Sequence, residues 1–227
     1  MCEIKRVVSI GAHSLDAELM GGPLIIKYVK ENNAKCTLLH VTQGRLEDPE
    51  ATKEECDAYL QNLLDQNAKA AEKLGADCLW LGYVSSNMPT LDEFSSRLEK
   101  YFVDEKVDLV ITHWRGSMHP RHINTHDAAF EAVKRLRRKG SNIKLVFGET
   151  FEDLVGFIPQ AYFVLTEEEV KQWFESLKCY TVFKGGVNDF PYLKYYPTNL
   201  QIRQIESGSA GPTVCYMYAS LIENKLF

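Results

Sequence analysis

A 227-residue chain with 45% hydrophobic residues is long enough for one large α/β domain with a sizeable core. A net charge of −5 without a long basic block argues against nucleic acid as the main partner, and no apolar run approaches the ~20 residues of a membrane span. The N-terminus has no signal-peptide layout and the six cysteines show no CxxC spacing. We therefore expect a reduced, cytoplasmic protein that acts on a small molecule, either alone or as a homo-oligomer.

Short apolar segments alternate with amphipathic segments over the first two thirds of the chain. The apolar segments predict strands at residues 6–11, 35–42, 77–82, 107–112 and 143–148. Helices are predicted at 16–33 and 52–74, after a capping box at 90–93, and from residue 129 to near Gly140. Gly21, Gly22 and Pro23 are expected to interrupt or kink the first helix, and the glycines suit either close helix–sheet packing or backbone approach to a ligand. Repeated βα units predict an α/β fold: a Rossmann-like, doubly wound, mainly parallel sheet with helices on both faces.

The pattern changes after Glu149. Residues 161–165 and 213–219 predict strands, a second capping box at 166–169 opens a helix, and the Gly-, Pro- and Tyr-rich residues 185–197 predict a loop. We therefore expect one domain over residues 1–227, in which a βα core of 1–148 carries a C-terminal cap of 149–227 over its active edge.

Four of the six histidines lie between residues 113 and 126, where the fourth predicted strand leads into a helix. The first strand leads in the same way into His13 and Asp16. Ligands bind at the carboxyl edge of parallel strands, and imidazole plus carboxylate is the ligand set of a catalytic zinc. The sequence therefore predicts a metal site at this edge, whereas His40, inside a strand, is expected in the core.

Loops after two other predicted strands supply further charged candidates at the same edge. They are Arg45, Glu47 and Asp48 after the second strand, and Glu149, Glu152 and Asp153 after the fifth. We take Glu149 as a candidate for binding substrate.

Three motifs resemble the LmbE-like, PIG-L-type zinc-dependent N-deacetylases, the family of GlcNAc-PI de-N-acetylase, over about two thirds of the chain. Residues 12–18 (AHSLDAE) with Gly21 and Gly22 are similar to the family's Ala-His-Pro-Asp-Asp, Ala-Glu and Gly-Gly. Residues 112–113 (TH) and 119–122 (HPRH) resemble its Thr-His strand end and His-Pro-Asp-His. Residues 81–88 (LGYVSSNM) look like its Leu-Gly-Tyr-x-Asp-Ser-x-Met loop.

The resemblance implies a set of roles for individual residues. It implies a zinc ion held by His13, Asp16 and His122. It also implies that His119 polarises the substrate carbonyl or stabilises the developing oxyanion.

Three positions depart from the family pattern. Leu15 stands where the family has its general-base Asp, Arg121 where an Asp orients the motif histidine, and Ser85 where an Asp binds a substrate hydroxyl. Leucine cannot accept a proton, and the loss of a positioned base typically costs ~10²–10⁴ in rate. Zinc alone still lowers the pKa of bound water to about 7, so a slow hydrolase is still compatible with this sequence.

We rank first a zinc-dependent hydrolase that cleaves a C–N amide bond of a small polar metabolite, as an N-deacetylase does, with zinc-bound water as nucleophile. A close alternative is a zinc-dependent hydratase of an unsaturated carboxylic acid, with Glu47 or Asp48 as the base. Arg45, Arg115 and Arg121 would then pair with an anionic substrate. A non-catalytic zinc-binding pseudoenzyme is the third alternative.

Overall fold

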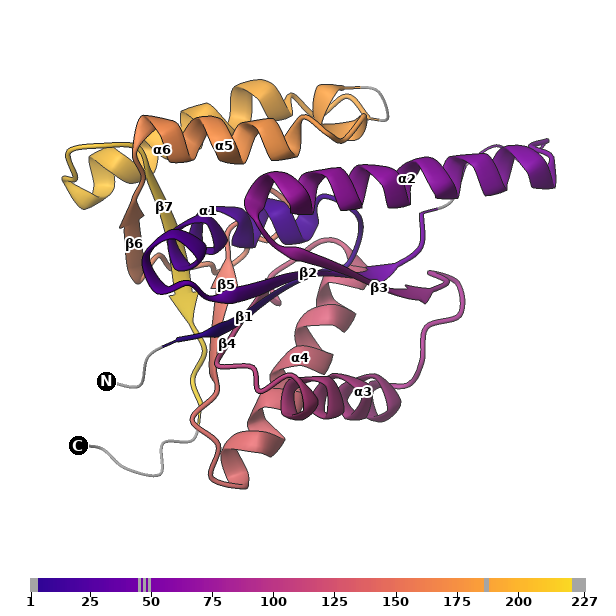
Figure 1. Ribbon diagram of the computed structural model, residues 1–227, viewed down its shortest axis with the longest axis horizontal. Helices are drawn as coiled ribbons and strands as arrows, with labels where there is room; N and C mark the ends of the chain where they lie inside the picture. Colours follow the sequence, from indigo (N-terminus) through magenta and orange to yellow (C-terminus); the bar gives the residue numbers. More distant parts are fainter. Residues whose placement is uncertain (1–3, 45, 47, 49, 186–187, 222–227) are drawn as a thin grey trace.

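The computed structural model describes residues 4–44, 46, 48, 50–185 and 188–221. A seven-stranded sheet in the order β3-β2-β1-β4-β5-β7-β6 forms its centre (Figure 1). The strands are β1 (Arg6–Gly11), β2 (Lys35–Thr42), β3 (Asp77–Tyr83), β4 (Leu109–His113), β5 (Lys144–Gly148), β6 (Ala161–Val164) and β7 (Thr213–Tyr218). The helices are α1 (Asp16–Asn32), α2 (Lys53–Leu74), α3 (Leu91–Asp104), α4 (Pro120–Arg138), α5 (Glu167–Leu177), the 3-10 turn η1 (Val182–Lys184) and α6 (Tyr192–Ser207).

The first five strands run parallel, and β7 pairs antiparallel with both β5 and β6. From β1 the chain builds outward through β2 to β3, and it then returns to place β4 and β5 on the other side of β1. The order therefore reverses between β1 and β4. In open α/β sheets a reversal of this kind leaves a crevice at the carboxyl ends of the two strands, and ligands bind there.

Helices cover both faces of the sheet, which confirms the predicted α/β, doubly wound, mainly parallel architecture. Helices α1, α2, α5 and α6 lie on one face and α3 and α4 on the other (Figure 1). Each face has its own apolar core. One contains Leu24, Ile25, Leu38 and Trp173, and the other contains residues such as Phe94.

Helix α1 runs without a break through Gly21, Gly22 and Pro23, so the predicted interruption is wrong. The glycines allow α1 to pack closely against the sheet and α5. A Cβ atom at Gly21 would lie 2.3 Å from the Ser9 side chain, and one at Gly22 would lie 2.6 Å from Cδ1 of Trp173. Close packing of α1 between the sheet and α5 therefore outweighs the local cost of a proline in a helix. Close helix–sheet packing, one of the two roles considered for these glycines, is confirmed.

The predicted loop at residues 185–197 is wrong in its second part, because α6 begins at Tyr192 and contains Pro197. Tyr192, Tyr196 and Leu200 are buried at i, i+4 and i+8, which is the spacing of one helix face. Burial of this face stabilises the helix, although its Pro- and Tyr-rich composition predicts a loop.

Residues after Glu149 extend the sheet as well as covering it. Strands β6 and β7 lie in the same sheet as the first five strands, and α5 packs on α1 and α2. The division into a 1–148 core and a 149–227 cap over the active edge stays a prediction.

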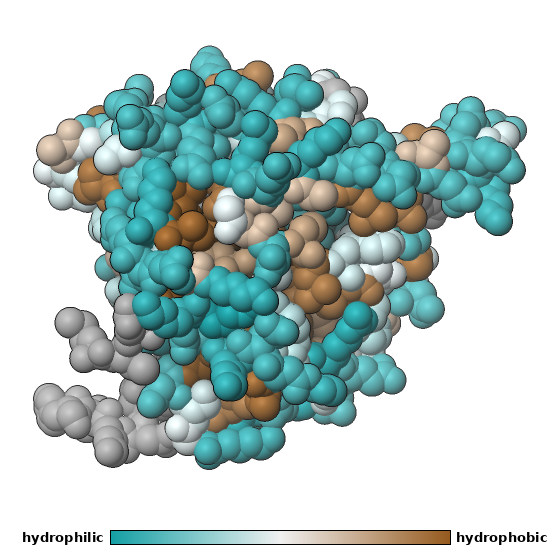
Figure 2. All heavy atoms as spheres, in the orientation of Figure 1, coloured by the Kyte–Doolittle hydropathy of each residue, from teal (hydrophilic) through white to brown (hydrophobic). Residues whose placement is uncertain are grey.

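The first half of α2 projects from the body of the protein (Figure 1), and its surface is mainly hydrophilic in Figure 2. None of the described helices is long and apolar enough to cross a membrane.

Candidate metal centre

The candidate site lies where β1 and β4 end, at the reversal of strand order. Gly11 ends β1 directly against the first turn of α1, and a Cβ atom there would lie 2.4 Å from the Ala17 nitrogen. Only glycine lets the two segments meet so closely. The chain then enters α1 through Leu15, whose φ of 85° is a left-handed conformation that a bulky side chain rarely adopts. This tight turn places His13 and Asp16 at the carboxyl end of β1.

The three predicted metal ligands are brought together around one oxygen atom of Asp16. Oδ2 of Asp16 lies 3.1 Å from Nδ1 of His13 and 3.4 Å from Nε2 of His122. The backbone N–H of His13 also donates to Oδ2, at 2.7 Å, and so fixes the carboxylate. His122 reaches this point from the first turn of α4.

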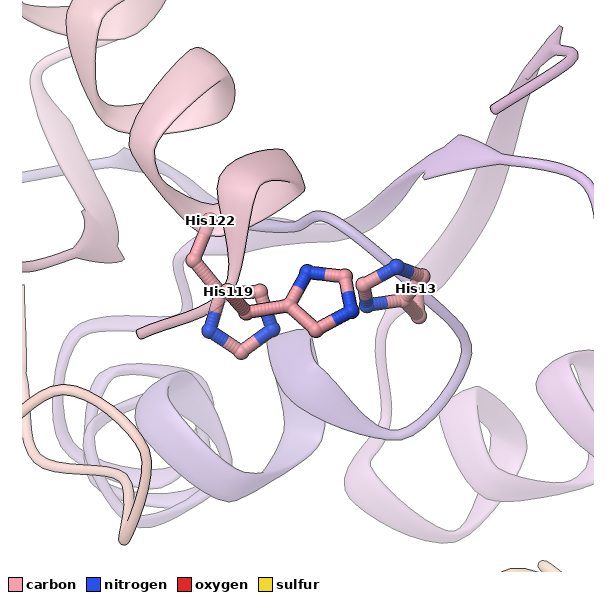
Figure 3. A group of neighbouring side chains, drawn as sticks. All are labelled: His13, His119 and His122. Carbon is pink, nitrogen blue, oxygen red and sulfur yellow. The ribbon is translucent and has the colours of Figure 1, made fainter. Parts of the chain in front are cut away.

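Nε2 of His122 is a polar atom that the protein leaves unsatisfied. It is buried and has no hydrogen-bond partner among the described residues. Two groups of ligand atoms, each within 4.8 Å of one another, share His122: one with His13 and His119, the other with Asp16 and His113. A buried lone pair beside a carboxylate and further imidazoles fits a zinc ion, which takes nitrogen and oxygen ligands. The ring nitrogens of His13, His119 and His122 gather at the N-terminal end of α4 (Figure 3).

His113 supports the site from beneath and is poorly placed to bind a metal. Its Nε2 accepts a hydrogen bond from the Ala12 N–H at 3.0 Å, so the lone pair is engaged. Its Nδ1 lies 2.7 Å from Oδ2 of Asp153. His126 lies further along α4 and bonds through Nδ1 to the carbonyl oxygen of His113, at 2.9 Å.

Asp153 is the residue that organises these histidines. It is fully buried, and its second oxygen, Oδ1, accepts from Nδ1 of His122 at 2.8 Å. The carboxylate therefore holds the protons of both rings on Nδ1 and turns Nε2 of His122 toward Asp16. A carboxylate behind a histidine in this way orients it for metal binding. The only sequence signal for Asp153 was its position in a loop at the same sheet edge.

The two carboxylates make the site strongly attractive to positive charge. Burial by itself raises the pKa of Asp16, but the charge of His122 and the adjacent rings of His113 and His13 outweigh burial and lower that pKa well below its usual value. Burial likewise lowers the pKa of His122, yet Asp16 and Asp153 raise it to about 10. Without a metal ion, His122 therefore holds a proton on Nε2 next to Asp16, where a bound cation would otherwise lie.

His119 is the N-cap residue of α4 and is half-buried. Its Nδ1 accepts a hydrogen bond from the Arg121 N–H at 3.2 Å, which leaves the ring proton on Nε2. Burial, followed by the neighbouring His13 and His122, lowers the pKa of His119 to about 4, so the ring is neutral near pH 7. The ring packs edge-on against His13, with 4.6 Å between the centroids.

Glu152 is a further carboxylate at the rim of the site. Its Oε2 lies 3.7 Å from Nε2 of His122, and its side chain keeps 34% of its surface exposed. Its carbonyl oxygen accepts a hydrogen bond from the Met118 N–H at 3.3 Å, which ties the two loops together. Burial raises the pKa of the Glu152 carboxyl. Leu15, by contrast, is buried in the apolar core and offers no polar group.

The two described arginines that were expected to bind substrate have partners of their own. Nε of Arg115 donates to Asp127 at 2.8 Å, and the Arg115 side chain is 60% exposed. Arg121 donates to Oδ1 of Asn124 at 3.1 Å. Arg115 lies between β4 and α4, and Arg121 lies in the first turn of α4, so both residues lie near the site.

Glu149 is engaged away from the histidines: its carboxylate forms an ion pair with Arg203 of α6. Asp48 is exposed, and its side chain accepts a hydrogen bond from the Glu50 N–H at 2.9 Å within a local turn. Arg45 and Glu47 lie outside the described residues.

Comparison with known proteins places the chain in a family. The model of a family described as "PIG-L: GlcNAc-PI de-N-acetylase" matches residues 8–133, more than half of the chain. The chain belongs to the PIG-L family. No curated protein matches it.

Three solved structures share the fold at low sequence identity. N,N'-diacetylchitobiose deacetylase from Pyrococcus horikoshii has a TM-score of 0.72 and 18% identity over 95% of this chain and 84% of that chain. The zinc-inhibited form of teicoplanin deacetylase Orf2 has a TM-score of 0.73 and 15% identity over 95% and 99%. GalB, the 4-carboxy-2-hydroxymuconate hydratase from Pseudomonas putida, has a TM-score of 0.77 and 14% identity over 98% and 100%.

Proposed function

We propose that the protein is a zinc-dependent hydrolase that cleaves a C–N amide bond of a small polar metabolite, in the manner of an N-deacetylase. The observation that carries the proposal is the buried Nε2 of His122, which has no hydrogen-bond partner among the described residues and lies 3.4 Å from Oδ2 of Asp16, beside His13. Membership of the PIG-L family supports the same reaction class. The cytoplasmic location and the homo-oligomer stay predictions.

In this proposal His13, Asp16 and His122 hold the ion. Zinc, when bound, would polarise the substrate carbonyl and lower the pKa of water. Nε2–H of His119 donates a hydrogen bond to the carbonyl oxygen and stabilises the negative charge that develops there. His119 can do so as a neutral ring, because the Arg121 N–H occupies Nδ1 and leaves the proton on Nε2.

We assign the proton acceptor to Oε2 of Glu152. A base must reach the attacking water, and the side chain of Leu15 has no atom that can take a proton. Glu152 reaches to within 3.7 Å of Nε2 of His122, and its remaining exposed surface leaves room for water. It would take a proton as the water attacks and would return it to the leaving nitrogen.

Hydration of an unsaturated carboxylic acid is the second candidate. The observation that favours it is Leu15, because the carboxylate of the deacetylase motif is missing while His13, Asp16 and His122 remain. GalB, whose fold is similar, is a hydratase. In this case Glu47 or Asp48 would supply the base.

An anionic substrate would fit this second candidate best. Arg45, Arg115 and Arg121 would bind its carboxylate, because a guanidinium can pair with a carboxylate through two hydrogen bonds. In that event Arg115 would exchange its present partner, Asp127, for the substrate.

The first test is the zinc content of the wild type, of Asp16→Ala and of Asp104→Ala, an exposed carboxylate on α3 that serves as the control. We expect about one zinc ion per chain in the wild type and in the control, and loss of the ion in Asp16→Ala. Absence of zinc from the wild type, even after zinc is added, would contradict both candidate functions.

The second test separates the two reactions. The zinc-loaded protein is incubated with a panel of N-acyl compounds and a panel of unsaturated carboxylic acids. Release of the acyl acid that depends on His119 supports the hydrolase. Turnover of unsaturated acids alone, lost in Glu47→Gln or Asp48→Asn, supports the hydratase. Zinc binding without turnover of either panel would support the third hypothesis, a non-catalytic zinc-binding pseudoenzyme.

A further inference from the structure

A buried polar cluster lies beneath α1, on the face of the sheet that α1 and α2 cover. Glu18 of α1 and His40 of β2 are both fully buried, and Nε2 of His40 lies 3.1 and 3.2 Å from the two carboxylate oxygens. The hydroxyl of Tyr180 donates to Oε1 of Glu18 at 2.7 Å, and it also lies 3.0 Å from Oδ1 of Asn67. The Glu18 carboxylate is therefore held in one position and fixes the His40 ring.

The other ring nitrogen of His40 faces a cysteine. Nδ1 lies 3.8 Å from Sγ of Cys78, within the range of a hydrogen bond to sulfur. Cys78 belongs to β3, the edge strand of the sheet, and is exposed to solvent. A carboxylate, an imidazole and a thiol are thus connected through the two ring nitrogens of His40, with Glu18 buried and Cys78 exposed.

We propose that Cys78 is a reactive thiol, activated by the His40–Glu18 pair, and that it takes small electrophiles and peroxides. An imidazole that a carboxylate holds in one orientation is the usual partner of an activated nucleophile. The reagent needs no cavity, because Cys78 is an exposed residue.

The charge state of His40 suits this role. Burial by itself lowers the pKa of His40, but the Glu18 carboxylate outweighs burial, and the pKa is raised to about 10. The ring therefore carries a proton near pH 7 and presents a positive charge to the sulfur. The thiolate is the nucleophilic form of cysteine, and a neighbouring cation favours it.

The chemistry is balanced in both kinds of reaction. With a peroxide, sulfur attacks one oxygen, the O–O bond breaks, and the leaving hydroxide takes the proton from His40 and departs as water. The sulfur is oxidised to a sulfenic acid and the peroxide is reduced. With an alkyl halide, a C–S bond forms, the carbon–halogen bond breaks and the halide leaves, while His40 keeps its proton.

The other described cysteines differ from Cys78 in their surroundings. Burial raises the pKa of Cys36 to about 12, and burial also raises the pKa of Cys179 and of Cys215. Thiols of this kind are inert near neutral pH. Cys56 is exposed on α2 and provides a control thiol within the same molecule.

The test is competitive labelling of the native protein with iodoacetamide at pH 7, followed by mass spectrometry of the peptides that contain Cys78 and Cys56. An ordinary thiol is only a few per cent ionised at pH 7, so a thiol held entirely as thiolate reacts up to about 30-fold faster. We expect Cys78 to react at least about tenfold faster than Cys56. In His40→Gln we expect the two rates to become similar. Cys78→Ser confirms which peptide carries the label.

Two results would overturn the proposal. The first is a ratio near one in the wild-type protein, and this comparison does not depend on whether any variant folds. The second is an unchanged ratio in a His40→Gln protein whose circular dichroism is that of the wild type. The peroxide reaction is tested by treating the protein with hydrogen peroxide and then with a probe that reacts with sulfenic acids. Absence of the probe adduct at Cys78 would contradict the peroxide reaction.

Discussion

Replacement of Asp153 by asparagine removes one of the two acceptors that orient the histidines of the metal centre. The two carboxylate oxygens of Asp153 accept from Nδ1 of His113 at 2.7 Å and from Nδ1 of His122 at 2.8 Å. Asparagine keeps one oxygen, and its amide group would point N–H bonds at a ring N–H. One histidine must therefore rotate or lose its partner, and the buried negative charge is lost as well.

Loss of such a partner typically weakens metal binding 10- to 100-fold, which is about 1.4–2.7 kcal/mol. We expect Asp153→Asn to fall within that range. The measurement is the zinc dissociation constant, determined by competition with a fluorescent chelator, for Asp153→Asn and for the control Asp104→Asn. The control makes the same chemical change at an exposed position on α3 and should leave the constant unchanged.

An unchanged dissociation constant in a folded Asp153→Asn protein would refute this reasoning. It would mean that the orientation of His122 comes from packing against His113 and not from the carboxylate. Nitrogen-15 NMR of the histidine rings provides an independent readout. In the wild type we expect His122 to carry a proton on Nδ1, and in the variant we expect that signal to shift or broaden.

Three further changes test other parts of the molecule. Glu152→Gln should lower amide turnover about 10²–10⁴-fold without changing the zinc content, and equal turnover would mean that another group is the base. Gly11→Ala places a Cβ atom 2.4 Å from the Ala17 nitrogen and 2.7 Å from Cβ of Asp16, so we expect thermal unfolding to show a loss of about 1–3 kcal/mol together with weaker zinc binding. The pKa of His40 is raised to about 10, above the ~6.5 of an unfolded chain, so its contribution to stability is complete below pH 6.5 and is lost as the pH rises through 10. The destabilisation caused by His40→Gln, measured by urea unfolding, should therefore shrink between pH 6.5 and 10 by at most about 1.4 kcal/mol per pH unit, and a constant or growing difference would contradict this sign.

Local pattern in the sequence was enough for the alternating strands and helices and for the kinds of side chain at the site. The predicted strand at residues 35–42 matches β2, and the capping boxes at 90–93 and 166–169 are present at α3 and α5. Such signals depend on neighbours within a few residues along the chain, so one sequence is sufficient to detect them. Asp16 and five of the six histidines were also detectable, because they lie in the segments that follow two predicted strands.

Only the tertiary structure determined the features that depend on contacts between residues distant in the sequence. Pro23 and Pro197 lie within helices because α1 and α6 bury apolar faces against other elements, and burial outweighs the local preference. Glu149 and Asp153 occupy the same loop region, yet Glu149 pairs with Arg203 of α6 while Asp153 bridges two histidines. No local pattern separates these two carboxylates. Their roles follow from the order of strands in the sheet and from the position of α6, which are set by contacts between residues far apart in the sequence.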